Sequence, residues 1–426
     1  MHWYFQSNLL LRIMAGLILG AAVGIALGFA PEAAAVFVKY TKFFGDVFIR
    51  LLRMIVVPVI FFSLITGAAS ITPHQLGRVG LKTLLFYLAT SAISIGIALL
   101  LANLLQPGTG LGLVGDAAIQ GKEAAAPELS KVLLNIVPMN PVESLAKGEV
   151  LPIIFFALVF GISLSVLRDS GEERISRNAD NLFHICSAIA ETMYKLVGGI
   201  MQYAPIGVFV LISIVFAQQG PKVIGPLVFV TFVFFLGLIL HLLVGYGGIL
   251  ALFRLNVFKF LRRAEEASIT AFVTRSSNAT LPISMRISEE KLGVPRPIAS
   301  FALPVGATVN MDGTSVYLAV GAIFIGNAVG MPLGFDQQLT LLIVGTLAAI
   351  GSAGVPGAGA IMMLMVLEAV GLKVEAGTAV AAGYAMILGI DAIFDMGRTC
   401  LNVTGDLVGV VVVAQSEHQL DHEKWR

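Results

Sequence analysis

Runs of about 20 consecutive apolar residues limit what this chain can fold into more than any other feature. They lie near residues 9 to 30, 43 to 71, 83 to 106, 150 to 167, 181 to 216 and 223 to 253. A helix of that length crosses the hydrocarbon core of a bilayer. The residues are 57% hydrophobic and 12% charged, which is about half the charged fraction of a typical soluble domain. The sequence therefore predicts an all-helical integral membrane protein.

Charge and cysteine content exclude several other classes. The formal net charge of +1 provides no field that favours nucleic acid or a strongly acidic partner. Cys186 and Cys400 lie in apolar stretches, and their spacing suits neither a disulfide framework nor a metal knuckle. The apolar run from Asn8 to Ala30 is longer than the core of a signal peptide, so we expect a retained first span.

Basic residues predict the orientation, because Lys and Arg are enriched in short cytoplasmic loops. They follow the even-numbered spans, whereas Lys39 and Lys42 in the first outer loop count against this pattern and are outnumbered by the residues of the other short loops. We therefore expect a multi-pass protein of the cell membrane with both termini in the cytoplasm. The basic residues are Arg78, Lys82, Arg168, Arg174, Arg177, Arg254, Lys259, Arg262 and Arg263.

Small residues and proline interrupt the apolar segments after Arg263. One interruption covers residues 274 to 282 and the other covers 351 to 359, and each is followed by a longer hydrophobic segment, near 298 to 330 and 376 to 413. Non-helical backbone at membrane depth is tolerated only where it is buried in protein or lines a wet cavity. The pattern predicts two re-entrant hairpins whose tips meet at one central site.

The last apolar segment carries a stripe of polar residues at spacings of four, three, four and four: Asp391, Asp395, Arg398, Asn402 and Asp406. These positions share one face of a helix. An ionised side chain costs about 2.5 to 3.5 kcal/mol at the centre of a span, and such residues usually line a substrate or ion path. The alternative is an internal salt-bridge network that only fixes helix packing.

A second polar centre runs from Thr308 to Thr314 between two apolar runs. Its Asn, Asp and Gly residues favour local unwinding, which would expose carbonyl groups. Carbonyl and carboxylate oxygens are ligands for a hard cation such as Na⁺. The alternative is a simple kink between two short helices. Serine hydroxyls at the first hairpin tip, and the helix N-termini that follow both tips, would attract a carboxylate.

These residues resemble the dicarboxylate/amino acid:cation symporter family, also called the glutamate transporter family. The similar motifs are the serine tip before Thr280-Leu281-Pro282, Asn310 to Thr314, Ala353 to Gly357, and Asp395 to Thr399 followed by Asn402 and Gly405-Asp406. Pro152 to Phe155 in the fourth span extends the resemblance over essentially the whole chain. It implies eight transmembrane helices plus two re-entrant hairpins, arranged as inverted repeats.

The resemblance also implies the domains and the assembly. Residues 1-255 would be mainly the scaffold and trimerisation part, with span 3 and parts of span 6 as candidates for the transport core. Residues 256-415 would form that core, and 416-426 a polar C-terminal tail. The protein would be a homotrimer in which each protomer transports independently.

The resemblance assigns substrate contacts residue by residue. Arg398, assisted by Thr314, would bind the side-chain carboxylate of glutamate or aspartate. Asp395 would hold the ammonium group, and Asp391 would orient Arg398 from behind. The α-carboxylate would be held by Asn402, Thr399, Ser276 and Ser277. The other residues expected around the substrate are Arg275, Met311, Val355, Pro356, Gly357, Ala358 and Gly359.

Three sodium sites follow from the same resemblance. The first comprises Gly306, Asn310, Asn402 and Asp406, the second Tyr87, Thr90, Ser91, Asn310 and Asp312, and the third Thr308, Met311, Ile350 and Ser352. Na⁺ coupling is preferred to H⁺ coupling, because the run from Tyr87 to Ser91 is present. The sequence departs from many relatives at Asn278 and Ala349, which could alter affinity, and Arg275 is expected to pair with Asp395 or Asp391 when the site is empty.

The predicted function is sodium-coupled uptake of glutamate or aspartate by an elevator-like alternating-access movement. A proton-coupled glutamate/aspartate carrier and a C4-dicarboxylate carrier of the same family are the alternatives. An intramembrane hydrolase is not expected, because no histidine accompanies Ser277 and none of the six histidines falls in a polar centre. A channel is not expected either, because several carboxylates with one arginine describe a binding site better than a selectivity ring.

Overall fold

The computed structural model describes residues 9–69, 78–113, 134, 136–349, 357–375 and 377–425. Every regular element in these ranges is a helix, which confirms the predicted all-α class. In chain order the elements are α2 (Leu9–Gly28), α3 (Pro31–Ala69), α4 (Arg78–Leu105), α6 (Pro141–Lys147), α7 (Val150–Arg168), α8 (Glu173–Gln219), η1 (Gly220–Val223), α9 (Ile224–Leu240), η2 (His241–Tyr246), α10 (Gly247–Leu252), α11 (Val257–Thr274), α12 (Ser277–Glu290), α13 (Arg296–Val309), α14 (Asp312–Ala328), α15 (Phe335–Ala349), α16 (Ala358–Ala369), α17 (Ala379–Ser416) and η3 (His422–Trp425).

Six helical segments in the described part of the chain are long and apolar enough to cross a membrane. They are Leu11–Gly28, Pro31–Ala69, Arg78–Leu105, Glu173–Leu252, Arg296–Ala328 and Ala379–Ser416. The 80-residue segment Glu173–Leu252 covers two of the predicted runs, and the shorter apolar helix Pro152–Arg168 corresponds to a third. The total of eight spans plus two hairpins remains a prediction.

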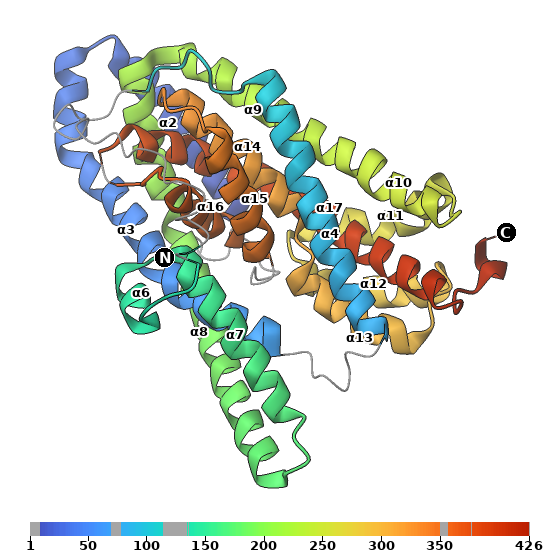
Figure 1. Cartoon of the computed structure of the whole chain (residues 1–426). Coiled ribbons are helices and arrows are strands. Elements are labelled where there is room, and N and C mark those ends of the chain that lie inside the picture. Colours follow the sequence, from blue (N-terminus) through green and yellow to red (C-terminus); the bar gives the residue numbers. More distant parts are fainter. Residues whose placement is uncertain are drawn as a thin grey trace.

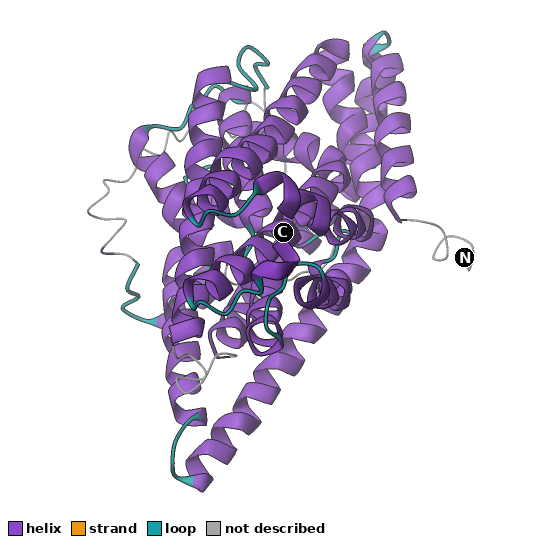
Figure 2. Cartoon of the chain, turned by 90° about the vertical axis from the view of Figure 1, so that its right-hand side faces the viewer, coloured by secondary structure: helices purple, strands orange, loops and turns teal. Residues whose placement is uncertain are grey.

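The helices form two groups that lie side by side (Figure 1). In the first group, α2 and α3 pack along α8, and α7 packs along α3. The paired α7 and α8 extend beyond the rest of the molecule to a narrow tip, which the turned view also shows (Figure 2). In the second group, α17 packs against α11, α13 and α14, and α14 also packs against α4.

Glycines at every fourth position bring α2 close to α8. A Cβ added at Gly16, Gly20 or Gly24 would lie 2.5 to 2.7 Å from a backbone oxygen of α8. Those oxygens belong to Pro205, Phe209 and Ser213, which are also four residues apart. Helices in membranes gain van der Waals contact when small residues allow their backbones to approach. The first group is therefore closely packed along this seam.

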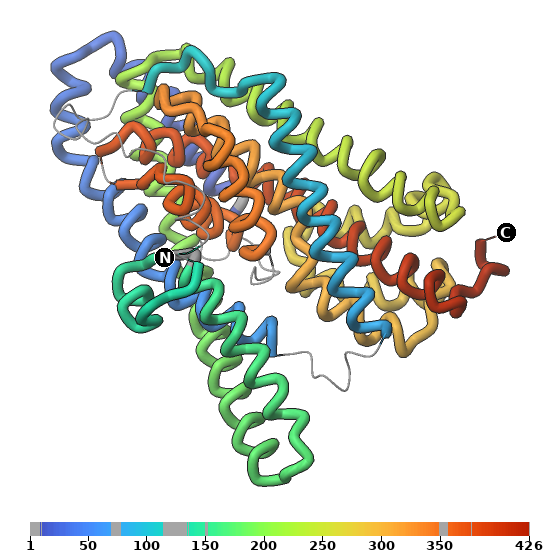
Figure 3. Tube along the Cα trace, in the orientation of Figure 1, coloured from blue at the N-terminus to red at the C-terminus, as the bar shows by residue number. Residues whose placement is uncertain are grey.

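A hairpin followed by a longer segment occurs twice in the second group, as the sequence predicts. The hairpin α11–α12 precedes α13 and α14, and the hairpin α15–α16 precedes α17, as the chain trace shows (Figure 3). Arg275, at φ +55°, ends α11, and the side chain of Ser276 caps α12 by accepting a hydrogen bond from the backbone N–H of Ala279. Such a cap satisfies one of the free N–H groups at a helix start.

The predicted local unwinding within the hydrophobic segment near residues 298 to 330 is also observed. Helix α13 ends at Val309, Asn310 has an extended backbone, and α14 begins at Asp312. By contrast, α17 continues without interruption through its whole polar stripe. The stripe of α17 and the break between α13 and α14 face each other, and this contact defines the centre of the second group.

Candidate functional site

Arg398 lies at the middle of α17 and is almost completely buried. Its Nη1 donates a hydrogen bond to Asp391 Oδ1 at 2.9 Å, and its Nη2 donates to Asp395 Oδ1 at 2.8 Å. We call these three residues the arginine cluster. Two carboxylates bind one guanidinium, so the cluster carries a net negative charge when all three groups are ionised.

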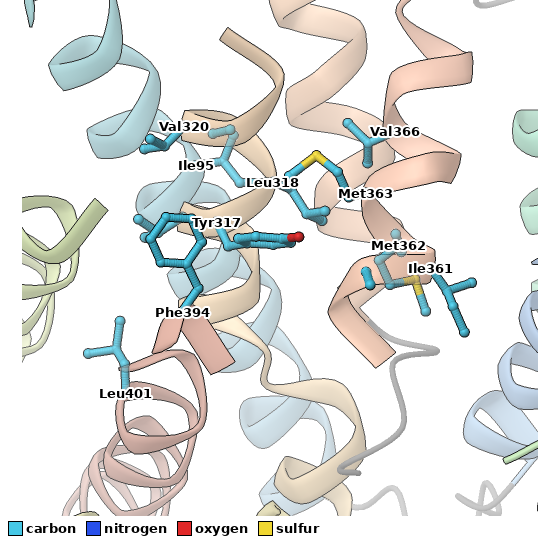
Figure 4. Close-up of a cluster of buried hydrophobic side chains, with 14 of the residues drawn as sticks. Ile95, Tyr317, Leu318, Val320, Ile361, Met362, Met363, Val366, Phe394 and Leu401 are labelled. Carbon is cyan, nitrogen blue, oxygen red and sulfur yellow. The ribbon is translucent and has the colours of Figure 1, made fainter. Parts of the chain in front are cut away.

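Neighbouring helices fit closely around the arginine cluster. The ring of Tyr317, from α14, lies 4.2 Å from Arg398 Cζ, which is cation–π distance. Tyr317 in turn packs against Phe394 of α17 and faces α16, where Met363 lies (Figure 4). A Cβ at Gly359 would lie 2.2 Å from Arg398 Nη1, so the start of α16 contacts the guanidinium directly.

The arginine cluster faces the first helix group across a small pocket. From the second group, the lining includes Arg275, Asp391 and Asp395, together with the backbone of Gly357. From the first group, apolar side chains of α2 and α8 complete the wall: Leu9, Ile13, Met201, Ala204 and Val208. The polar groups are thus on one side and an apolar surface on the other.

A second buried cluster joins α17 to the break between α13 and α14. Asn310 Nδ2 donates to Asp406 Oδ1 at 3.0 Å and to the carbonyl oxygen of Asn402 at 3.1 Å. The side-chain oxygen of Asn402 accepts from the backbone N–H of Gly313 at 2.7 Å, and its Nδ2 donates to Met311 Sδ. The donor that bonds Asp406 here, the side-chain amide of Asn310, is neutral.

The third cluster surrounds Asp312 at the start of α14. Ser91 Oγ donates to Asp312 Oδ1 at 2.6 Å, and Tyr246 Oη donates to Asp312 Oδ2 at 2.7 Å. His241 Nε2 lies 3.1 Å from the same Oδ2 atom, and the imidazole is fully buried. Thr90 Oγ1 donates to Asn310 Oδ1 at 3.5 Å and links this cluster to the second one.

The comparisons with known proteins agree with this arrangement. The model of the sodium:dicarboxylate symporter family matches residues 9–416. The chain belongs to the sodium:dicarboxylate symporter family. Family membership identifies it as a membrane transporter, and confirms that it is not an enzyme.

Three relatives show which described proteins the chain is similar to. A proton/sodium-glutamate symport protein of Geobacillus stearothermophilus is 35% identical over 97% of this chain and 95% of its own length. A proton/glutamate-aspartate symporter of Escherichia coli is 34% identical over 98% and 95%. A C4-dicarboxylate transport protein of Rhodopseudomonas palustris is 32% identical over 99% and 90%. The chain is therefore similar to glutamate and glutamate-aspartate symporters and to a C4-dicarboxylate transport protein.

Several of the residues predicted to bind the substrate lie together in the structure. The structure brings Asp391, Asp395 and Arg398 together, with Gly357 N–H 3.4 Å from Asp395 Oδ2 and Gly359 at the guanidinium. Among the other predicted substrate residues, Ser276 caps α12. The buried ones include Ser277, Thr314, Ala358, Thr399 and Asn402. Val355 and Pro356 lie outside the described residues.

Some of the predicted sodium ligands lie close together in the structure, and others do not. Gly306 and Asp406 are close, because a Cβ at Gly306 would lie 2.5 Å from Asp406 Oδ1. Tyr87 Oη donates to the carbonyl oxygen of Ala302 at 3.0 Å, so no hydrogen bond joins it to Asp312 in the described part of the chain. Thr308 Oγ1 donates within α13, while Ile350 and Ser352 lie outside the described residues. The described residues contain no group of three or more His, Cys, Asp or Glu side chains that could hold a metal ion, and the sodium sites remain a prediction.

Arg275 lines the pocket beside Asp391 and Asp395, while Arg398 forms an ion pair with each of these carboxylates. The pairing of Arg275 in the empty site remains a prediction. One expectation about the histidines is wrong. His241 does fall in a polar centre, because the π-helical segment η2 of the sixth span brings it against Asp312. Sequence reasoning missed both His241 and Tyr246. A histidine inside an apolar run was the available signal, since ionisable residues within a span usually have a functional partner.

Proposed function

We propose that the chain is a secondary symporter that takes up glutamate, aspartate or both together with Na⁺. The observation that carries the proposal is the buried arginine bound by two carboxylates of its own helix, Asp391 and Asp395. An acidic amino acid can exchange partners in this cluster without leaving Arg398 or Asp395 unpaired. Its side-chain carboxylate would replace Asp395 on Arg398, and its ammonium group would then pair with Asp395.

A C4-dicarboxylate fits the same cluster less well. It could occupy Arg398, but it has no ammonium group for Asp395, which is buried. Leaving one partner of a buried ion pair without a counter-charge typically costs about 3 to 5 kcal/mol. The C4-dicarboxylate alternative is retained because relatives of that description match almost the whole chain.

Cation coupling is supported by the surroundings of Asp312 and Asp406. Asp406 is buried and is bonded by the neutral amide of Asn310. Asp312 is buried among Ser91, Tyr246 and His241. A buried carboxylate is costly without a counter-charge. A co-transported cation bound by these oxygens would supply the charge, and a site with several hydroxyl and carbonyl oxygens suits Na⁺. H⁺ is the alternative, because the names of relatives include both ions.

An elevator-like movement is supported by the separation of the two helix groups. The pocket wall formed by α2 and α8 is apolar, so the polar face of α17 could slide past it without breaking specific polar contacts. The ion pair between Arg53 of α3 and Glu368 of α16, at 2.7 Å, would have to open during such a movement. Residues 1-255 would act mainly as the scaffold of a homotrimer and 256-415 as the mobile core, with both termini cytoplasmic.

Uptake into proteoliposomes tests the proposal directly. Radiolabelled glutamate, aspartate and succinate would be supplied under an inward Na⁺ gradient and, separately, under an inward proton gradient. We expect accumulation of an amino acid that requires Na⁺. Accumulation driven by protons alone would refute Na⁺ coupling, and transport of succinate alone would refute the role given to Asp395.

A further inference from the structure

The C-terminal segment after α17, residues 417–425, folds back onto the second helix group. It lies beside the α11–α13 helices at the end of the molecule opposite α3 (Figure 1). Trp425 is buried, and its indole N–H donates to the carbonyl oxygen of Leu292 at 2.8 Å. The backbone N–H of Asp421 donates to the carbonyl oxygen of Gly293 at 3.0 Å. Both acceptors belong to the turn that joins α12 to α13.

The same segment contacts both arms of the first hairpin at its base. On α11, Lys259 Nζ donates to the carbonyl oxygen of Trp425 at 3.1 Å, and Arg263 Cζ lies 5.3 Å from the centre of the indole ring. On α12, the carbonyl oxygen of Glu289 accepts a hydrogen bond from Lys424 Nζ at 2.7 Å. One short segment therefore joins the first residues of α11 to the last residues of α12.

The other end of the segment is anchored to α4. Lys82 Nζ forms an ion pair with Glu417 and donates to Ser416 Oγ at 3.0 Å. The segment also requires the turn at Gly293, where φ is +72° and a Cβ would lie 2.7 Å from the carbonyl oxygen of Asp421. Because Gly293 adopts a left-handed conformation and the two backbones touch, a larger residue there would strain the contact.

We propose that residues 417–425 form a strap that holds the two arms of the α11–α12 hairpin together at their base. The hairpin tip, Arg275 to Ser277, lies at the far ends of the same two arms, with Arg275 in the pocket of the arginine cluster. A fixed base limits how far the tip can leave that pocket. The strap thus acts on access to the binding site through the first hairpin, and this inference does not depend on which substrate is transported.

The strap predicts that freeing Trp425 makes the hairpin tip more accessible. Ser277 is buried at the tip, so a Ser277→Cys probe reports opening through its rate of reaction with a maleimide. Cys186→Ala and Cys400→Ala remove the two natural cysteines. We expect Trp425→Ala to raise the labelling rate by roughly three- to tenfold, the factor that corresponds to the loss of one net hydrogen bond.

Two controls separate this effect from general destabilisation. Glu423→Ala changes an exposed residue of the same segment whose side chain makes no hydrogen bond or ion pair within the described residues, and it should leave the labelling rate unchanged. Trp425→Phe keeps a ring next to Arg263 but loses the N–H donor, and it should give an intermediate rate. Because Trp425→Phe is the milder change, it remains informative if Trp425→Ala lowers the unfolding temperature.

Docking of the strap can be measured separately from its effect. The sequence contains two tryptophans, so Trp3→Phe leaves Trp425 as the single indole fluorophore. We expect its quenching by iodide to be weak, as for a buried ring. Quenching as strong as that of a free indole would overturn the docked arrangement. Weak quenching together with equal labelling rates in the parent, Trp425→Ala and Trp425→Phe would overturn the role of the strap in access.

Discussion

Gly359 lies against the guanidinium of Arg398, and this contact allows a quantitative prediction for Gly359→Ala. The new Cβ would lie 2.2 Å from Nη1, 2.5 Å from Cζ and 2.9 Å from Nη2. Ordinary van der Waals contact begins at 3.4 Å, so Nη1 would have to retreat by the difference, about 1.2 Å. A long side chain normally makes such a shift easily, but here two ion pairs hold the guanidinium.

A retreat of that size would break the hydrogen bond from Nη1 to Asp391 Oδ1, which is 2.9 Å long. Misplacement of a binding group by about 1 Å can cost up to about 100-fold in activity. We therefore expect Gly359→Ala to raise the KM for the acidic substrate by about 10- to 100-fold, measured as initial uptake of radiolabelled aspartate or glutamate into proteoliposomes.

Gly96→Ala is the matched control. Gly96 is also a helical glycine of the second helix group, but a Cβ there meets no atom within 4 Å. The KM of this variant should equal that of the parent. An unchanged KM in Gly359→Ala would refute the reasoning, because it would mean that the guanidinium is free to move or does not bind the substrate.

Two further predictions concern single carboxylates. Asp406→Asn removes a buried charge that is bonded by the neutral amide of Asn310. Na⁺ that binds the folded state raises the Tm, and this variant should abolish that rise. Tm would be measured in NaCl and in choline chloride at equal ionic strength, and a rise equal to that of the parent would contradict the sodium assignment. Glu417 has a pKa below its ordinary value of 4.5, chiefly because Lys82 donates a hydrogen bond to it. The ionised Glu417 therefore stabilises the folded protein at pH values above its unfolded-state pKa, and this stabilisation is lost as the pH falls through its folded-state pKa. We expect the Tm of Glu417→Gln to decrease less than that of the parent as the pH is lowered. An equal decrease in both proteins would argue against the Lys82 contact.

The polar stripe of α17 could be read from spacing alone. Residues three and four apart share a helix face, so Asp391, Asp395 and Arg398 were expected to lie together, and they do. The break between α13 and α14 was equally readable, because Asn310 and Gly313 are poor helix formers within an apolar run. These features depend on neighbours along the chain, which the sequence contains directly.

Partners from distant segments could not be read in the same way. The sequence did not reveal that Tyr246 would donate a hydrogen bond to Asp312. It also did not reveal that His241 would reach Asp312, because this depends on the π-helical segment η2, whose extra residue per turn changes the direction of the side chain.

The sequence by itself determined the membrane class, the two hairpins, and the type of group available at the centre of the molecule. Hydrophobic length and helical spacing are local properties, and they suffice for those conclusions. Only the tertiary structure decided which groups meet: Gly359 of α16 at the guanidinium of α17, and Trp425 at the turn after α12. Those contacts join residues 39 and 133 positions apart, and close packing of helices selects them from the many pairings that the same polar residues could make.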